Sequence, residues 1–157
     1  MLFDEFWLLK VVSISLRKIS PSFLLLMFKY FNPNPLYDGN KKGWKSVDCA
    51  VRSICAATGK DWLTIYNLLS IAGRQTFSMP HELSVYRKVV LDLGFRLIKN
   101  CKKGELKIKD LVQLSKKNND IYLCKVNNHY TCCNNGILLD TWDCSECEVT
   151  QYWIKLK

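Results

Sequence analysis

The chain has 157 residues, 48% of them apolar, which is enough to build the core of one compact domain. A charged fraction of 24% combined with this apolar content excludes extended disorder. The formal net charge of +9 comes mostly from lysines, but the lysine pairs are scattered and are not interleaved with aromatic residues. We therefore expect no specific nucleic-acid partner, since binding through charge alone would weaken steeply with salt.

Residues 1–26 differ in composition from the rest of the chain. They contain two apolar runs, FWLLKVVSISL and FLLLMF, which are interrupted by charged residues and a proline. No uninterrupted run approaches the about 20 residues of a membrane span, so we expect no stable membrane span. Three interpretations stay open: an additional helix covering the domain, an amphipathic segment on a membrane surface, or upstream sequence outside the natural product. We assign 1–26 as a hydrophobic N-terminal extension and 27–157 as the domain.

The eight cysteines do not indicate a disulfide-bonded secreted protein. Acidic residues Asp4 and Glu5 stand where a secretory signal is basic, and no small-residue cleavage site follows them. Reduced thiols are the state expected in a cytosol, so the sequence predicts a cytoplasmic protein.

The first half of the domain predicts helices that follow an irregular leader over 31–47. Asp48 and Asp61 are the expected N-caps of the first two helices, and Gly59 and Gly73 are expected to end them. Pro80 fits the first turn of a third helix. The three helices are expected at about 49–58, 61–73 and 80–93.

The second half of the domain predicts strands, because apolar and polar residues alternate in short runs. The dipeptide Asn135-Gly136 is a strong signal for a two-residue hairpin turn. Helices followed by antiparallel strands predict an α+β domain, with N-terminal helices packed on a C-terminal antiparallel sheet. The strands are expected at 95–99, 121–126, 129–133, 137–142 and 148–156, with one short helix at 107–117.

Cys49 is distinguished from the other cysteines by its position. It follows the expected N-cap and so lies in the first turn of a helix, where unpaired N–H groups and the helix dipole favour an anion. This placement lowers the pKa of a thiol and makes a nucleophilic thiolate available near neutral pH. Cys49 is therefore the candidate nucleophile, although a small buried helix residue is the alternative.

The two histidines differ in their surroundings. His81 lies in the first turn of a surface helix, where a solvated and inert side chain is expected. His129 opens a strand with apolar and aromatic neighbours. A cysteine at a helix start paired with a histidine at a strand start is the arrangement of papain-like sites, in which the imidazole takes the thiol proton and later protonates the leaving group. His129 is the candidate base.

An acidic residue after His129 would orient its imidazole. With a two-residue turn, Asn134 faces Ile137, and Asp140 becomes the diagonal neighbour of His129 on the same face. A three-residue loop would shift the register by one residue and favour Asp143. Because Asn-Gly prefers the two-residue turn, we select Asp140 and keep Asp143 as the reserve.

The fourth element of such a site is a donor to the oxyanion. The backbone N–H of Cys49 can supply one hydrogen bond. A side-chain donor is expected from the leader, because no Gln precedes Cys49. The sequence leaves four candidates open: Asn32, Asn34, Asn40 and Lys45.

The segments DCAVRSICAATGKDWLTIYNLL, HYTCC, LLDTWD and QYWIK together resemble a family of small papain-like cysteine peptidase-fold proteins of bacteriophages and bacterial mobile elements. A more distant similarity is to the bacteriocin-processing peptidase domains of ABC exporters. The resemblance covers about residues 27–155 and implies a papain-like fold, with Cys49 as nucleophile, His129 as base and Asp140 as the orienting residue. We expect a peptide or protein substrate and no cofactor. The resemblance also implies a natural start at Met27, since the family's chains begin near a KYFNPNP-like stretch.

The chain departs from the exporter-type peptidases at two positions. Those peptidases carry a Gln a few residues before the nucleophile and often a Gly directly after it, whereas this chain has no such Gln and has Ala50 after Cys49. These departures argue against efficient proteolysis but do not change the expected fold. They keep open a second hypothesis, a catalytically weak or inactive papain-like scaffold that binds a host or phage protein.

A zinc site is the rival chemistry. Cys144 and Cys147 form a CxxC pair, and Cys132 and Cys133 lie across the hairpin. Four thiolates can bind zinc tetrahedrally. The match is incomplete, because adjacent strand residues point to opposite faces of a sheet. The sequence predicts no metal in the site, with cysteine-coordinated zinc as the second alternative.

Overall fold

The computed structural model describes residues 27–36 and 47–155. Within these ranges the chain is α+β, with four helices and one mixed sheet. The helices are α2 (Cys49–Thr58), α3 (Trp62–Thr76), α4 (Leu83–Asp92) and α5 (Ile108–Asn118). The strands are β1 (Phe28–Tyr30), β2 (Phe95–Asn100), β3 (Ile121–Val126), β4 (His129–Asn134), β5 (Ile137–Asp140) and β6 (Gln151–Lys155). The interpretations of 1–26 lie outside the described residues.

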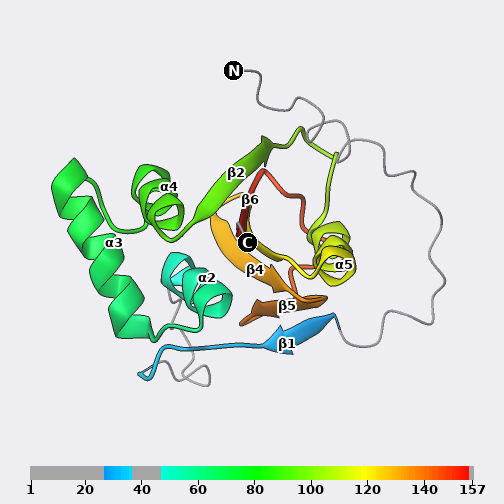
Figure 1. Cartoon of the computed structure of the whole chain (residues 1–157), viewed down its shortest axis with the longest axis horizontal. Coiled ribbons are helices and arrows are strands. Elements are labelled where there is room, and N and C mark those ends of the chain that lie inside the picture. Colours follow the sequence, from blue (N-terminus) through cyan, green and yellow to red (C-terminus); the bar gives the residue numbers. More distant parts are fainter. Residues whose placement is uncertain (1–26, 37–46, 156–157) are drawn as a thin grey trace, which may run out of the picture.

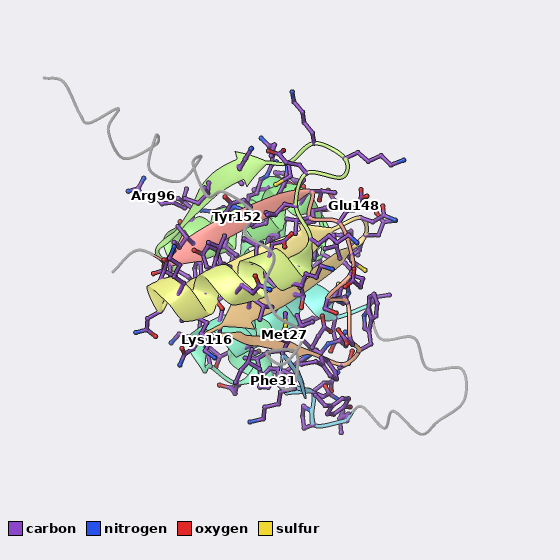
Figure 2. All side chains as sticks on the ribbon, turned by 90° about the vertical axis from the view of Figure 1, so that its right-hand side faces the viewer. Met27, Phe31, Arg96, Lys116, Glu148 and Tyr152 are labelled. Carbon is purple, nitrogen blue, oxygen red and sulfur yellow. The ribbon has the colours of Figure 1, made fainter. Side chains whose placement is uncertain are left out.

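The sheet has the strand order β1-β5-β4-β3-β6-β2, and helices cover both of its faces. Figure 1 shows α2, α3 and α4 gathered on one side of the strands and α5 on the other. Figure 2 views the molecule from the α5 side, where this helix lies over the sheet with its axis nearly along the strands. On the opposite face α2 packs on β4, while α3 packs on α2 and α4. This layering follows from strands that are apolar on both faces.

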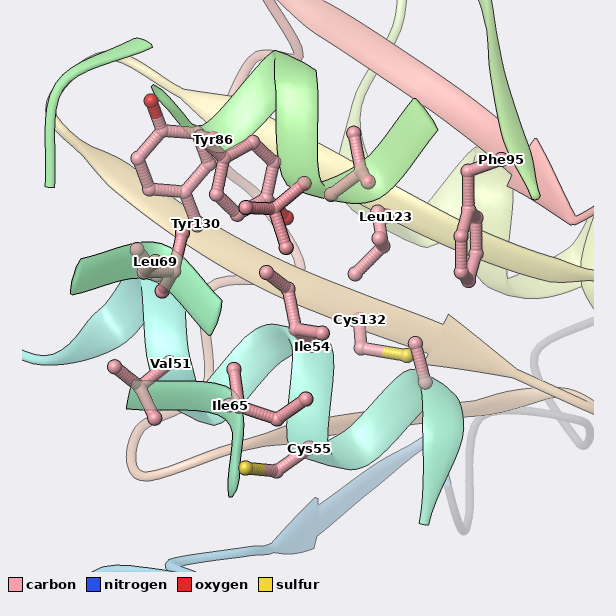
Figure 3. Packing of buried hydrophobic residues seen from close by; sticks show 14 of the residues in the cluster. Val51, Ile54, Cys55, Ile65, Leu69, Tyr86, Phe95, Leu123, Tyr130 and Cys132 are labelled. Carbon is pink, nitrogen blue, oxygen red and sulfur yellow. The ribbon is translucent and has the colours of Figure 1, made fainter. Parts of the chain in front are cut away.

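Alternation along β4 sends neighbouring side chains into two separate core layers. Tyr130 and Cys132 face α2 and α4, and Cys133 faces α5. In the first layer Ile54 of α2 lies close to the strand, as Figure 3 shows. The ring of Tyr86 stacks on that of Tyr130 with centroids 4.0 Å apart. The position of α2 against β4 is thus fixed by the packing of fully buried side chains.

The predicted antiparallel pairing of the C-terminal strands is confirmed, but the prediction was wrong at the edge of the sheet next to β5. Strand β1 runs parallel to β5, with Tyr30 paired to Asp140, so the sheet is mixed and includes a strand that precedes the helices. A parallel neighbour is possible because the whole α2–β4 region connects the two strands. The sequence did not reveal β1, because three half-buried or exposed residues carry no recognisable alternation.

Two helix ends also differ from the expectation. Helix α3 continues past Gly73 to Thr76. Gly73 does not end the helix but allows the backbone of Ser78 to approach it closely, since a Cβ there would lie 2.6 Å from the carbonyl oxygen of Ser78. Helix α4 begins at Leu83 and not near Pro80. Residues 78–82 form a turn in which the backbone N–H of Met79 donates to Glu82 Oε1 at 3.0 Å. Asp61 caps α3 as predicted and accepts from the N–H of Thr64 at 2.9 Å.

The β4–β5 turn has the predicted two-residue form. Asn134 pairs with Ile137, and both turn residues have positive φ angles, 47° at Asn135 and 81° at Gly136. A Cβ on Gly136 would also approach Lys116 of α5 to 2.9 Å. The glycine therefore serves both the turn and the close packing of α5.

We predict that Gly136→Ala lowers the free energy of unfolding by about 1–2 kcal/mol, because it combines a left-handed backbone with a steric contact. Gly59→Ala is the matched control. Gly59 has a φ of 71°, and nothing lies within 4 Å of a Cβ placed there, so only the backbone cost remains. Urea unfolding of the two variants measures the difference. Equal losses would show that Lys116 moves aside freely.

Candidate active site

Cys49 is the first residue of α2, as predicted, and is half-buried at the end of the helix that packs on β4. Backbone N–H groups in the first turn of a helix have no acceptor within it, so this end of α2 favours a negative charge. Figure 1 shows the start of α2 near β4 and β5, the two strands that carry the other predicted residues.

His129 and Asp140 meet across the β4–β5 hairpin. His129 is the first residue of β4 and Asp140 the last of β5, and the two-residue turn puts both on the same face. Their side chains form a hydrogen-bonded pair, with His129 Nε2 2.7 Å from Asp140 Oδ2. The side chain of Asp140 is 3% exposed and that of His129 18% exposed. The register argument therefore selected the correct neighbour of the imidazole.

The structure also brings the Cys49 thiol close enough to His129 for the imidazole to lower the pKa of the thiol. Burial alone would raise this pKa, but the interactions with His129 and with the Tyr130 backbone lower it. The positive charges of His129 and Arg52 lower it further. Since Nε2 of the imidazole faces Asp140, the other ring nitrogen, Nδ1, is the one left for the thiol.

The charges of the other two groups complement the thiolate. Burial opposes the charged form of His129, but hydrogen bonds to Asp140, Cys144 and Cys49 raise its pKa to about 11. Burial likewise opposes ionisation of Asp140, and its hydrogen bond to His129 holds its pKa below the ordinary carboxyl value. His129 and Arg52 therefore favour the thiolate form of Cys49, while Asp140 favours the charged form of His129.

Asp48 does not cap α2 with its side chain, which corrects the sequence prediction. Its backbone occupies the N-cap position, but no side-chain hydrogen bond to the helix end is made there. The carboxylate instead pairs with Arg52 and accepts hydrogen bonds from Asn34 Nδ2 and Trp62 Nε1, each at 2.9 Å. Asp48 thus ties the leader, α2 and α3 together directly beside Cys49.

Two of the predicted oxyanion donors can be placed. Asn34 lies beside the residue that precedes Cys49, with one of its amide hydrogens donated to Asp48. Asn32 Oδ1 accepts from the backbone N–H of Asn34 at 3.1 Å, which shapes the leader at this point. Asn40 and Lys45 lie outside the described residues.

Asp143, the reserve for Asp140, and His81, the other histidine, make no hydrogen bond to the described residues of this row. Asp143 is exposed and its Oδ1 accepts from the N–H of Ser145 at 3.0 Å, so it shapes the loop after β5. His81 is exposed in the turn before α4. Trp142 lies against the imidazole, and the ring centroids of Trp142 and His129 are 5.4 Å apart. Trp142 is 47% exposed to solvent.

Cys144 is a member of the site that sequence reasoning assigned only to the zinc alternative. Its Sγ lies 3.7 Å from Asp140 Oδ2 and the residue is 1% exposed. The sequence gives no signal for this contact beyond the position of Cys144 four residues after Asp140, because the contact depends on how the 141–150 loop folds back over the hairpin.

The four cysteines of the zinc alternative do not converge. Cys132 and Cys133 point into different core layers, and the Sγ of Cys133 lies 3.9 Å from that of Cys124. Among the residues that the structure describes, the one group of three or more metal-ligating side chains combines Cys144 with His129 and Asp140. A four-thiolate zinc site is therefore not supported. All eight cysteines are free thiols.

These features define an α+β protein in which a helix-start cysteine, a strand-start histidine and a buried aspartate form one hydrogen-bonded row. Comparison of the chain with protein-family models, curated proteins and solved structures finds no match. Within the described ranges, 27–36 and 47–155, no helix is long and apolar enough to cross a membrane. The functional argument therefore rests on the site itself.

We predict that Asp140→Ala brings the titration of His129 down toward the ordinary histidine pKa of about 6.5, because the principal partner of the imidazolium is lost. Proton NMR of the imidazole signals, assigned with a His81→Asn variant, measures this change. Asp143→Ala is the matched control and is expected to leave the titration of His129 unchanged. An equal effect of the two substitutions would show that Asp140 does not hold the charge of the ring.

Proposed function

We propose that this protein is a cysteine-nucleophile hydrolase with a papain-like fold, acting on a peptide or protein substrate. One observation carries the proposal: Cys49, at the start of a helix, lies where His129 lowers the pKa of its thiol, and the imidazole of His129 is hydrogen-bonded to a buried carboxylate. A nucleophile, a base and an orienting group in this order are the elements of thiol hydrolysis. The packing of the cysteine helix on a sheet that carries the histidine supports the papain-like assignment.

The charge state of the row suits attack on a carbonyl carbon. The Cys49 thiolate would add to the carbonyl, and the oxyanion would accept a hydrogen bond from the backbone N–H of Cys49. The imidazolium of His129 would give its proton to the leaving amine, which leaves a thioester on Cys49. Neutral His129 would then take a proton from water, whose oxygen attacks the thioester and releases the acid. Asp140 would keep the ring oriented and its charge stabilised throughout.

Several side chains around the row would hold it in position. Trp142 lies against the exposed side of the imidazole and would limit the access of water to the pair with Asp140. Asn34 lies beside the nucleophile on a leader held by Asp48 and is the described candidate for a second oxyanion donor. A reduced, cytoplasmic setting belongs to the same proposal, because the nucleophile works as a free thiol.

Labelling with peptide vinyl sulfones, followed by peptide mapping, tests the proposal together with turnover of a fluorogenic peptide library. We expect covalent labelling at Cys49 and turnover that is abolished in Cys49→Ala. Cys147→Ala, which removes another half-buried thiol, is the matched control and should retain both. A Cys49 that is not labelled in the folded protein contradicts the proposal. Labelling of Cys49 without turnover of any peptide would favour the scaffold that binds a host or phage protein.

A further inference from the structure

The carboxylate of Asp140 has a second neighbour that the proposed reaction does not use. Cys144 Sγ, His129 Nε2 and Asp140 Oδ2 offer one sulfur, one nitrogen and one oxygen, and these ligand atoms all lie within 4.8 Å of one another. Cys144 comes from the loop after β5, while the other two residues come from the hairpin. Three different donor types therefore converge on one point from three segments.

The spacing of these atoms approaches that of a tetrahedral metal site. Zinc binds such donors at about 2.0–2.3 Å, which puts neighbouring donors roughly 3.3–3.7 Å apart. Cys144 Sγ and Asp140 Oδ2 are 3.7 Å apart, and His129 Nε2 and Asp140 Oδ2 are 2.7 Å apart. The imidazole and the carboxylate would have to separate, and the imidazole side chain is partly exposed, which gives it room to move.

We propose that His129, Asp140 and Cys144 form a binding site for a borderline divalent transition ion, with Zn²⁺ as the best-matched metal. The mixed set of imidazole, carboxylate and thiolate suits zinc, whereas Mg²⁺ and Ca²⁺ require oxygen ligands. Three protein ligands leave one position of the tetrahedron for water or another ligand. The ionised carboxylate and thiolate together balance the charge of the ion.

Metal binding changes the protons of the cluster in a defined way. The ion would replace the proton on Nε2 of the imidazolium and the proton on Sγ of Cys144, so two protons pass to solvent for each ion bound. The ion would enter beside the His129 ring, since Asp140 and Cys144 are buried. Trp142, which lies on this ring and is half-exposed, would border the entry path.

The metal site shares two residues with the catalytic row, and this gives it a regulatory consequence. An ion on Nε2 would leave the Nδ1 proton beside Cys49 in place, but His129 could then release this proton only by becoming an imidazolate, so bound metal would slow the transfer of the proton to the leaving amine. This consequence rests on the proposed function. The metal site itself does not, because Cys49 is not one of its ligands.

Titration with Co²⁺ and then Zn²⁺ tests the site in the full chain with Cys101 and Cys147 replaced by serine, since these are the other half-buried thiols. We expect one equivalent of Co²⁺ to give the visible bands of a tetrahedral ion and a thiolate charge-transfer band, and Zn²⁺ to displace it. Cys144→Ala should remove the charge-transfer band and weaken binding at least about 100-fold, because even outer-shell substitutions cost about 10–100-fold. Cys49→Ala should keep both.

Three results would overturn the site: no one-to-one binding, a charge-transfer band that survives Cys144→Ala, or a band that disappears in Cys49→Ala. The last result would place the ion on the nucleophile. If Cys144→Ala does not fold, Cys144→Ser and Asp140→Asn give the same test with side chains of nearly unchanged size. Binding by Cys49→Ala tests the metal site alone, whereas slowing of peptide turnover by Zn²⁺ in the otherwise unchanged protein tests its regulatory consequence.

Discussion

Alkylation of Cys49 by iodoacetamide is expected to depend less steeply on pH between about pH 6 and about pH 8 in the unmodified protein than in His129→Ala, because the imidazole lowers the pKa of the thiol. At about pH 6 the variant should react at least about tenfold more slowly, because an ordinary thiol with a pKa of about 8.5 is almost fully protonated there. Mass spectrometry of the peptide that contains Cys49 measures both profiles.

The direction of this effect follows from the surroundings of Cys49. Burial raises the pKa of the thiol, and His129 is the main group that lowers it. Removing the imidazole leaves burial opposed only by the Tyr130 backbone and by Arg52. The thiolate is therefore stabilised mainly by His129.

Other thiols provide internal controls in the same experiment. Burial and the charge of Glu105 raise the pKa of Cys101, which is half-buried, so its rate should increase with pH in both proteins. Cys55, on the same helix as Cys49, has a pKa raised to about 12 by burial and nearby carboxylates, and should not react in the folded state. A Cys49 profile that follows that of Cys101 would refute the thiolate–imidazolium pair.

Asp48→Ala is expected to lower the free energy of unfolding by about 3–5 kcal/mol, the usual cost of leaving one member of a buried ion pair without its partner. The side chains of Asp48 and Arg52 are 11% and 8% exposed. The substitution would also leave the donors of Asn34 and Trp62 without their acceptor. Since domains are stable by about 5–15 kcal/mol, this loss should be large enough to shift the denaturant midpoint strongly.

The matched control is Asp92→Ala, which removes the acidic member of another pair with the same i,i+4 spacing. In that pair Lys88 and Asp92 are 42% and 62% exposed, so the expected change is below about 1 kcal/mol. The double variant Asp48→Ala/Arg52→Ala should lose less than the sum of the two single variants, because the charges are coupled. A loss from Asp48→Ala as small as that of the control would mean that water replaces the carboxylate.

The sequence was informative where local chemistry decides the outcome. The start of α2 at Cys49, the two-residue turn after Asn134 and the resulting approach of Asp140 to His129 all follow from short-range rules. The sequence could not reveal features that depend on distant segments. Strand β1 exists only because β5 offers it an edge, and the side chain of Asp48 left its capping role because Arg52, Asn34 and Trp62 surround it.

Gly73 and the 141–150 loop also show that the sequence does not predict contacts between distant segments. Gly73 has the residue type of a helix end but lies within α3, because the backbone of Ser78 approaches it closely. Cys144 was assigned by its CxxC spacing to a zinc site, yet the loop carries it to the carboxylate of Asp140. In both cases spacing along the chain suggested one role and contact in space decided another.

The parts of the row differ in how far apart they lie along the chain. His129 and Asp140 are 11 residues apart in one hairpin, whereas Cys49 lies much earlier in the chain, at the start of α2. During synthesis from the N-terminus, α2 is complete long before the hairpin emerges, so Cys49 would remain an ordinary, mostly protonated thiol until β4 pairs and α2 docks on it. The nascent chain would thus carry a protected cysteine, and reactivity would appear only with the finished tertiary structure.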